Sequence, residues 1–302
     1  QRIDLRFTEP RFLDSRVSAG FDIFSVDTDS SDDSSFQSSQ LGGALRFGLP
    51  LGEDTYLNTR YSYTKDELFI DSADLATASP AVIASVGNRS ISLVGYSLTY
   101  DTLNNPLKPT KGMKLVLNQD FAGVGGNVNY VRTTFTGSYL HKLYDDVIGS
   151  IRTSAGHIEG WNGQGVNLND AFYQGPNLVR GFDSAGIGPR DVSSLGQDAL
   201  GAKTYAGASA EVTFPLGLPE EFGVRGAAFV DAGTAFGTDV SPTICPPATC
   251  TVADSSAVRA SAGVSLLWDS PVGPMRFDFA EAFEAQSFDQ KQFFRFSGGT
   301  AF

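Results

Sequence analysis

The feature that most constrains this chain is a recurring alternation of apolar and polar residues in segments of about ten residues. In the first segment, Ile3, Leu5 and Phe7 alternate with charged or polar neighbours. Successive side chains of a β-strand point to opposite faces, so the pattern predicts strands with one apolar and one polar face. Clusters of Gly, Pro, Asp, Asn and Ser separate the segments, as turns require. The alternation therefore predicts an all-β chain.

The readable segments number thirteen, eight before residue 159 and five after a long loop. The alternation is weakest in segment 89–100. By residue number the segments are 2–7, 17–23, 40–47, 57–63, 89–100, 112–122, 128–142, 147–158, 203–214, 223–232, 256–269, 274–283 and 291–302.

Alternation alone is compatible with a soluble sandwich or with a membrane barrel, so other features have to separate the two. No run of about 18 apolar residues is present, which excludes a helical membrane protein. The strands are long, and the chain ends on an aromatic residue inside a strand. Connectors also alternate between short ones, such as 143–146 and 270–273, and long ones at 67–88, 159–202 and 233–255. Short periplasmic turns and long outside loops are typical of outer-membrane barrels. We therefore predict one domain, residues 1–302, forming a multi-pass transmembrane antiparallel β-barrel in the outer membrane of a Gram-negative bacterium.

The parity of the strands predicts which side chains face the lipid. One face of each segment is apolar, and in a barrel that face meets the hydrocarbon while the polar face lines the lumen. The residues expected to face lipid include Leu45, Phe47, Leu115, Leu117, Val264 and Leu266.

Several other functional classes find little support. The net charge of −12 argues against nucleic-acid binding, which needs a basic face. The two histidines, His141 and His157, belong to no recognisable Ser-His-Asp motif, so no catalytic residue is expected. The glycines at 123, 125 and 126 precede no helix, which favours a tight strand connection over a phosphate loop.

The two cysteines, Cys245 and Cys250, lie in the loop 233–255. A zinc site needs further cysteines or histidines, and none accompanies them, so no metal site is expected. The spacing favours a local disulfide.

Four stretches carry a resemblance to a known family. They are the turn YDTLNNPLKPTKG at 100–112, the loop motif VRGF at 179–182 followed by Gly186, Gly188 and Pro189, the strand motif FVDAG at 229–233, and the hairpin SPVGPMRFDFA at 270–280. They resemble the corresponding parts of the BamA/TamA/FhaC superfamily of polypeptide-transporting barrels, and the resemblance covers essentially the whole chain.

The resemblance implies an outer-membrane protein assembly factor that folds and inserts β-barrel clients, without nucleotide or other cofactor. The last hairpin and the long outside loops favour this over a TamA-like or two-partner secretion translocator, and a passive porin fits least well. The implied partners are unfolded outer-membrane proteins, outer-membrane lipids, and accessory lipoproteins that bind POTRA domains preceding the barrel.

The resemblance also implies a lateral seam between the first and last strands of the complete barrel. Members close with sixteen strands, so about three strands are expected to precede Gln1. In the last strand, Phe294, Phe296 and Phe302 share a parity that would face lipid. The neighbouring Gly298 and Gly299 would weaken the packing of this strand and allow it to bend.

The resemblance further implies that the loop 159–202 folds back into the lumen and is latched there by Arg180, within the motif Arg180, Gly181 and Phe182. Strand parity independently places Glu211 and Asp231 on the lumen side of neighbouring strands. A guanidinium can engage two carboxylates at once. Loss of Arg180 is thus expected to leave two like charges without a counter-ion.

Overall fold

The computed structural model of the chain describes residues 1–29, 34–72, 74–246, 250–271 and 273–298. Thirteen antiparallel strands form one sheet, as the alternation predicts, and each strand pairs with its neighbours in sequence order. These strands are β1 (Arg2–Glu9), β2 (Ser18–Asp29), β3 (Gln37–Pro50), β4 (Thr55–Phe69), β5 (Gly87–Asp101), β6 (Gly112–Gly126), β7 (Tyr130–Tyr144), β8 (Val147–Gly160), β10 (Thr204–Pro215), β11 (Val224–Phe236), β13 (Arg259–Ser270), β14 (Gly273–Glu284) and β15 (Phe294–Gly298).

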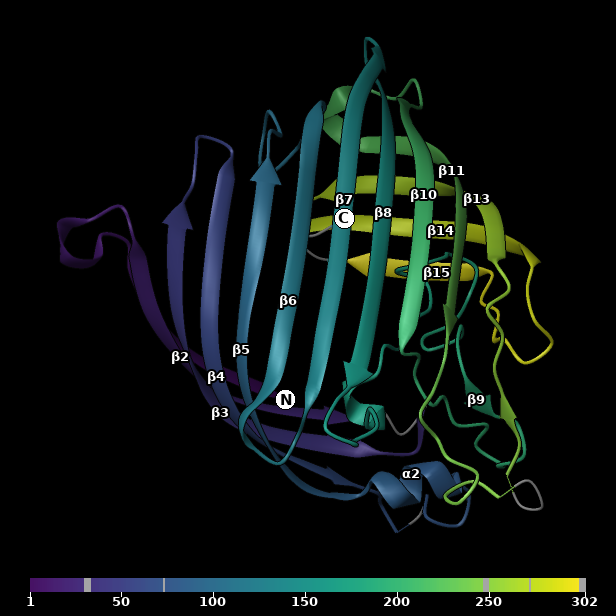
Figure 1. The fold of residues 1–302 in the computed structure, drawn as a ribbon. Coiled ribbons are helices and arrows are strands. Elements are labelled where there is room, and N and C mark those ends of the chain that lie inside the picture. The colour runs from purple at the N-terminus through teal and green to yellow at the C-terminus, as the bar shows by residue number, and fades with distance from the viewer. Residues whose placement is uncertain (30–33, 73, 247–249, 272, 299–302) are drawn as a thin grey trace.

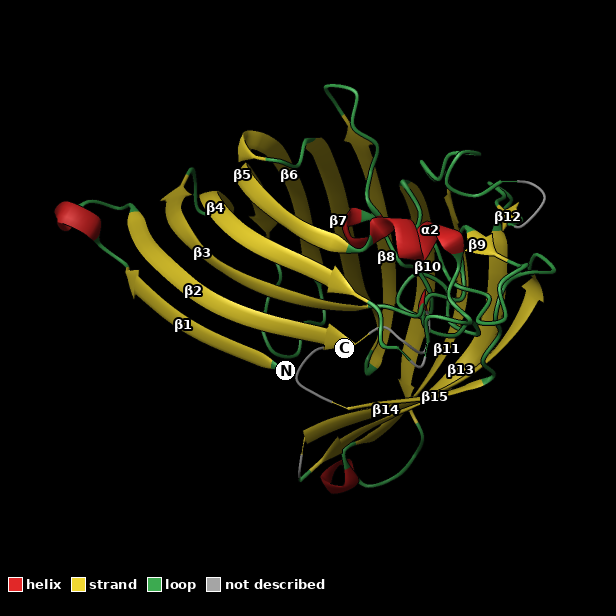
Figure 2. Cartoon of the chain, turned by 90° about the horizontal axis from the view of Figure 1, so that it is seen from below, coloured by secondary structure: helices red, strands yellow, loops and turns green. Residues whose placement is uncertain are grey.

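The sheet curls strongly around the long loops, with β1 at one end of its strand order and β15 at the other (Figures 1 and 2). The small elements are three 3-10 turns, a short helix and a separate two-stranded ribbon. They are η1 (Phe12–Asp14), α2 (Pro80–Ser85), η2 (Leu168–Asp170), β9 (Arg190–Asp191), η3 (Glu220–Phe222) and β12 (Val252–Ala253). In the described part of the chain, no helix has the length and apolar character needed to cross a membrane.

The helix α2 was not expected, because six residues are too few to show a helical period. It begins locally for clear reasons: Ser79 caps it by accepting a hydrogen bond from the Ala81 N–H, and Pro80 occupies its first turn. Ala81 and Val82 are buried, and α2 lies among the loops at one end of the strands (Figure 1). We call this group of loops the cap of loops.

The two faces of the sheet differ as strand parity predicts. On β13, the side chain of Val264 is 55% exposed, whereas that of the next residue, Ser265, is 6% exposed and hydrogen-bonds to Asp278. Leu45, Phe47 and Leu266 are also exposed on the outer face. Leu115 and Leu117 were also predicted to face the lipid, and both are only partly exposed.

Cysteine labelling should distinguish these faces in a membrane. With Cys245 and Cys250 replaced by serine, we expect Val264→Cys to react with a lipid-soluble maleimide and to resist a charged, water-soluble one, because hydrocarbon excludes the charged reagent. Ser265→Cys should show the opposite preference in the same bilayers, because its side chain lies on the polar inner face. Equal reaction of Val264→Cys with both reagents in intact bilayers would contradict the assignment of this face to lipid.

The last strand begins later than the predicted segment 291–302. It begins at Phe294, because residues 290–292 form backbone hydrogen bonds with the long loop instead of with β14. Gly299 and Phe302 lie outside the described residues. Phe294 and Phe296 are exposed on one side of β15, where they contact Phe279 and Phe277 of β14.

Candidate functional site

The loop between β8 and β10 packs against the inner side of the sheet. Leu178, Val179, Phe182 and Ile187 of the loop are buried in one apolar cluster with residues of the strands, among them Ala235 and Ala282. Burying such side chains contributes roughly 1.5–3 kcal/mol each, so the cluster holds the loop firmly. The loop therefore packs on the strands through a shared apolar cluster, and its folding into the lumen of a complete barrel and its role in function stay predictions.

Arg180 joins the loop to two neighbouring strands. Its Nε and Nη2 donate to the two carboxylate oxygens of Asp231 on β11, each at 2.6 Å, and its Nη1 donates to Oε2 of Glu211 on β10 at 2.5 Å. Its backbone N–H also donates to Asp231, at 3.0 Å. The guanidinium lies 3.4 Å from the ring centre of Phe229. All five donors of a guanidinium point in a fixed plane, which suits this two-carboxylate arrangement.

A second arginine, which the sequence reasoning missed, shares the same carboxylate. Arg276 on β14 donates from Nη2 to Glu211 Oε2 at 2.6 Å and from Nε to Asp278 Oδ1 at 2.7 Å. Ser265 completes this group by donating to Asp278. Strand parity could have found Arg276, since it alternates with the outward-facing Met275 and Phe277. It was missed because parity does not say which inward side chains meet.

This arrangement changes the expected effect of losing Arg180. Glu211 would keep Arg276 as its counter-ion, whereas Asp231 would lose both side-chain hydrogen bonds from its cation. One carboxylate, rather than two, would be left buried without a counter-ion.

Gly181 is required by the geometry of the loop next to Arg180. Its φ is +91°, in the left-handed region that side chains disfavour. A Cβ atom there would also lie 3.4 Å from the Cβ atoms of Ala280 and Ser261. The glycine thus allows the loop backbone to lie directly on β13 and β14, and it allows Phe182 to enter the apolar cluster.

A second ionic group fastens the start of the loop to another part of the wall. Arg89 on β5 pairs with Asp66 on β4 and with Asp170 in η2, at 2.5 Å in the latter case. Asn169 donates to both oxygens of Asp66, each at 2.9 Å. Burial raises the pKa of Asp170, and the neighbouring Arg89 opposes that rise. Nothing in the sequence pattern singles out this group, because its members lie far apart along the chain.

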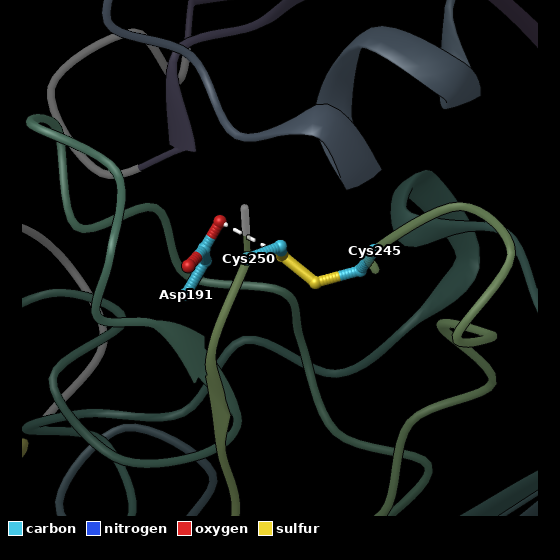
Figure 3. A group of neighbouring side chains, drawn as sticks. All are labelled: Asp191, Cys245 and Cys250. Carbon is cyan, nitrogen blue, oxygen red and sulfur yellow. Dashed lines mark hydrogen bonds between the residues drawn. A yellow bond between two sulfur atoms is a disulfide. The ribbon is translucent and has the colours of Figure 1, made fainter. Parts of the chain in front are cut away.

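The cap of loops contains the two cysteines, which are bonded to each other, with Cα atoms 5.1 Å apart. Figure 3 shows Asp191 beside this disulfide, with its Oδ2 3.1 Å from Cys250 Sγ. Asp191 also accepts hydrogen bonds from Ser79 and Ser193, each at 2.6 Å. Burial acts to raise the pKa of Asp191, but these hydrogen bonds outweigh it and the pKa is lowered. Among the described residues, Asp191 and the two cysteines are the one cluster of metal-ligating types, and disulfide sulfurs are not the thiolates that bind metals.

The disulfide predicts the outcome of a thiol titration. Protein denatured without reductant should show no reactive thiol, because the predicted position of this loop outside the membrane places it in an oxidising compartment. Adding reductant before denaturation should expose two. Two reactive thiols in the unreduced sample would contradict the pairing of Cys245 with Cys250.

Comparison with known proteins agrees with the fold and with the sequence motifs. The family model of the Omp85 superfamily domain matches residues 1–302. The outer membrane protein assembly factor BamA of Neorickettsia risticii is 34% identical over 279 residues, covering 92% of this chain and 36% of the relative. That of Nitratidesulfovibrio vulgaris is 28% identical over 285 residues, covering 90% of this chain and 32% of the relative. The chain thus spans about a third of the length of these curated relatives.

A solved structure supports the fold assignment. The crystal structure of BamA from Haemophilus ducreyi lacking POTRA domains 1–3 matches with a TM-score of 0.84, over 98% of this chain and 61% of that chain, at 22% identity. The two bacterial relatives are outer membrane proteins, and the chain is likewise an outer-membrane protein of a Gram-negative bacterium. Because the family model covers the whole length, the chain belongs to the Omp85 superfamily.

Proposed function

We propose that this chain is the barrel domain of an outer-membrane protein assembly factor, which folds β-barrel clients and inserts them into the bilayer. The observation that carries the proposal is the buried group around Arg180, which holds a long loop inside a curved wall of strands. A loop packed inside the wall narrows the passage that passive diffusion would use. The curated relatives that match most of this chain are named as assembly factors. The proposed activity is the assembly of client proteins and involves no catalysed covalent step.

The proposed chemistry is the exchange of backbone hydrogen bonds at a seam. The edge of β15 that faces away from β14 carries backbone N–H and C=O groups, and in hydrocarbon such groups have a strong tendency to pair. In the complete barrel this edge would pair weakly with the first strand and would open to an incoming client strand. Accessory lipoproteins and POTRA domains would deliver the unfolded client to it.

The test uses the complete protein reconstituted into liposomes. A urea-denatured client barrel is added, and its folding is followed by protease protection and by its altered gel mobility. We expect folding well above the rate in empty liposomes. Folding at the empty-liposome rate, combined with an open conductance across planar bilayers, would instead identify a passive pore. Transfer of the client into the liposome interior without insertion would identify a translocator.

A further inference from the structure

The last strand is held in an unusual way along its length. In the described part of the chain, β15 pairs with β14 from Met275 to Phe279, and β14 continues to Glu284. One further backbone bond joins them, from the Ala280 N–H to the Phe293 carbonyl at 2.9 Å. Beyond that point, residues 290–292 do not continue the ladder with β14 in the described structure. The start of β15, the strand at the proposed seam, must therefore be positioned by contacts with another part of the chain.

Residues 290–292 form backbone hydrogen bonds with the loop between β8 and β10, which we call the lumen loop. The bonded part of this loop follows directly after Arg180. The Asp183 N–H donates to the Gln290 carbonyl, and the Gln292 N–H donates to the Gly181 carbonyl, each at 3.0 Å. Between these bonds, Phe182 and Lys291 oppose each other as an antiparallel pair. This is the pattern of a non-hydrogen-bonded pair in an antiparallel ladder.

A third bond extends the pairing, from the Gln290 N–H to the Gly186 carbonyl at 3.0 Å. A Cβ atom on Gly186 would lie 2.5 Å from the Gln290 carbonyl oxygen and 2.8 Å from that of Asp183. Only glycine allows the two backbones this close approach. The loop and the segment before β15 thus form a short ladder of their own.

Side chains fix both strands of this short ladder. Phe182 has no exposed surface and is part of the cluster that contains Ala282 of β14. Lys291 donates from Nζ to the Ala282 carbonyl at 3.1 Å. Just before the ladder, Asp289 pairs with Arg259 of β13 at 3.0 Å, and the side chains of both are fully buried.

We propose that the pairing of residues 181–186 with 290–292 positions β15, and that Phe182 is the positioning residue through which the lumen loop controls the order of the seam strand. The inference rests on the proposed function, because it assigns the loop a role at the seam. If the loop leaves, residues 290–292 lose three backbone hydrogen bonds directly before β15. Because β15 lies at one end of the sheet order, it then frays from that side.

The test measures amide hydrogen exchange in the complete protein in bilayers, with no client present. Phe182→Ala should speed exchange in residues 290–298 by about tenfold or more, since local opening follows the loss of the buried anchor and of the hydrogen bonds that it holds. Leu200→Ala is the matched control. Leu200 is equally buried in the same loop, but it packs in the other cluster, with Leu168 and Val82. It should leave residues 290–298 unchanged.

Coupling is reciprocal, so the effect is also tested from the other side. Gln290→Pro removes the N–H that donates to Gly186 and should speed exchange in residues 175–189. Ser287→Pro, in the turn closed by the Asp289 N–H and the Gln286 carbonyl, serves as the control and should leave that loop unchanged.

Unchanged exchange in residues 290–298 of Phe182→Ala, in a variant whose strands 204–236 retain normal protection, would overturn the proposal. Unchanged exchange in residues 175–189 of Gln290→Pro would also overturn it. So would equal changes in exchange rate in a variant and in its control. Because exchange is read without a client, its result is independent of the assembly assay. Failure of the proposed function would appear only in client folding.

Discussion

Arg180→Ala is expected to abolish client assembly and to release the lumen loop, while the wall of thirteen strands persists. Removing one partner of a buried ion pair costs about 3–5 kcal/mol, because the remaining charge stays buried without a counter-ion. Here that charge is Asp231, since Glu211 keeps Arg276. The loop can avoid the cost only by leaving the wall and admitting water. Limited proteolysis should therefore show faster cleavage within residues 161–203.

Three further variants make this prediction specific. Arg180→Lys keeps the charge but lacks the planar fork, so it should be only partly tolerated. Arg180→Ala combined with Asp231→Asn removes the unpaired charge, and it should recover part of the protease resistance. Arg152→Ala is the control, because Arg152 on β8 lines a cavity together with Arg180 and Asp231 but takes part in no ion pair that the structure describes. Normal client assembly together with unchanged protease resistance in Arg180→Ala would show that the latch does not exist.

Arg89→Ala is expected to detach the beginning of the same loop. Asp66 and Asp170 would then face each other without their shared cation, and both carboxylates are almost fully buried. The expected cost is again about 3–5 kcal/mol, which should appear as rapid protease cleavage near Asp170. Arg60→Ala is the comparison variant. Arg60 also pairs with one carboxylate, Asp120, but its side chain is 40% exposed, so its loss should cost only about 1 kcal/mol or less.

The Arg89→Ala variant should also acquire a pH dependence. Burial already raises the pKa of Asp170, and Arg89 opposes that rise. Without Arg89 the pKa rises further, so the docked loop takes up a proton that the free loop does not. Because docking of the loop raises the pKa of Asp170, protonation of Asp170 stabilises the docked loop at low pH. This stabilisation is lost as the pH rises through the raised pKa. Protease resistance should therefore return as the pH falls. Equal cleavage of the variant at acid and neutral pH would contradict this assignment.

Much of the wall could be predicted from the sequence, because strand parity is a local property. Alternate side chains face opposite sides whatever the rest of the chain does, so Val264 and Ser265 could be assigned to opposite faces. The same parity placed Glu211 and Asp231 in the lumen. The family resemblance of the motif around Arg180 implied this arginine as their partner, and Arg180 hydrogen-bonds to both carboxylates. Its role as a latch stays a prediction.

Local sequence patterns were enough to predict the thirteen alternating strands, their inner and outer faces, and the motifs that the chain shares with the superfamily. The tertiary structure alone decided that Arg276 shares Glu211, that Arg89 fastens the loop, and that residues 290–292 leave the ladder of β14 to pair with the loop. Each of these contacts joins residues that lie far apart in the sequence. They depend on strand register and on the path of a loop without regular structure, and no local period in the sequence encodes either.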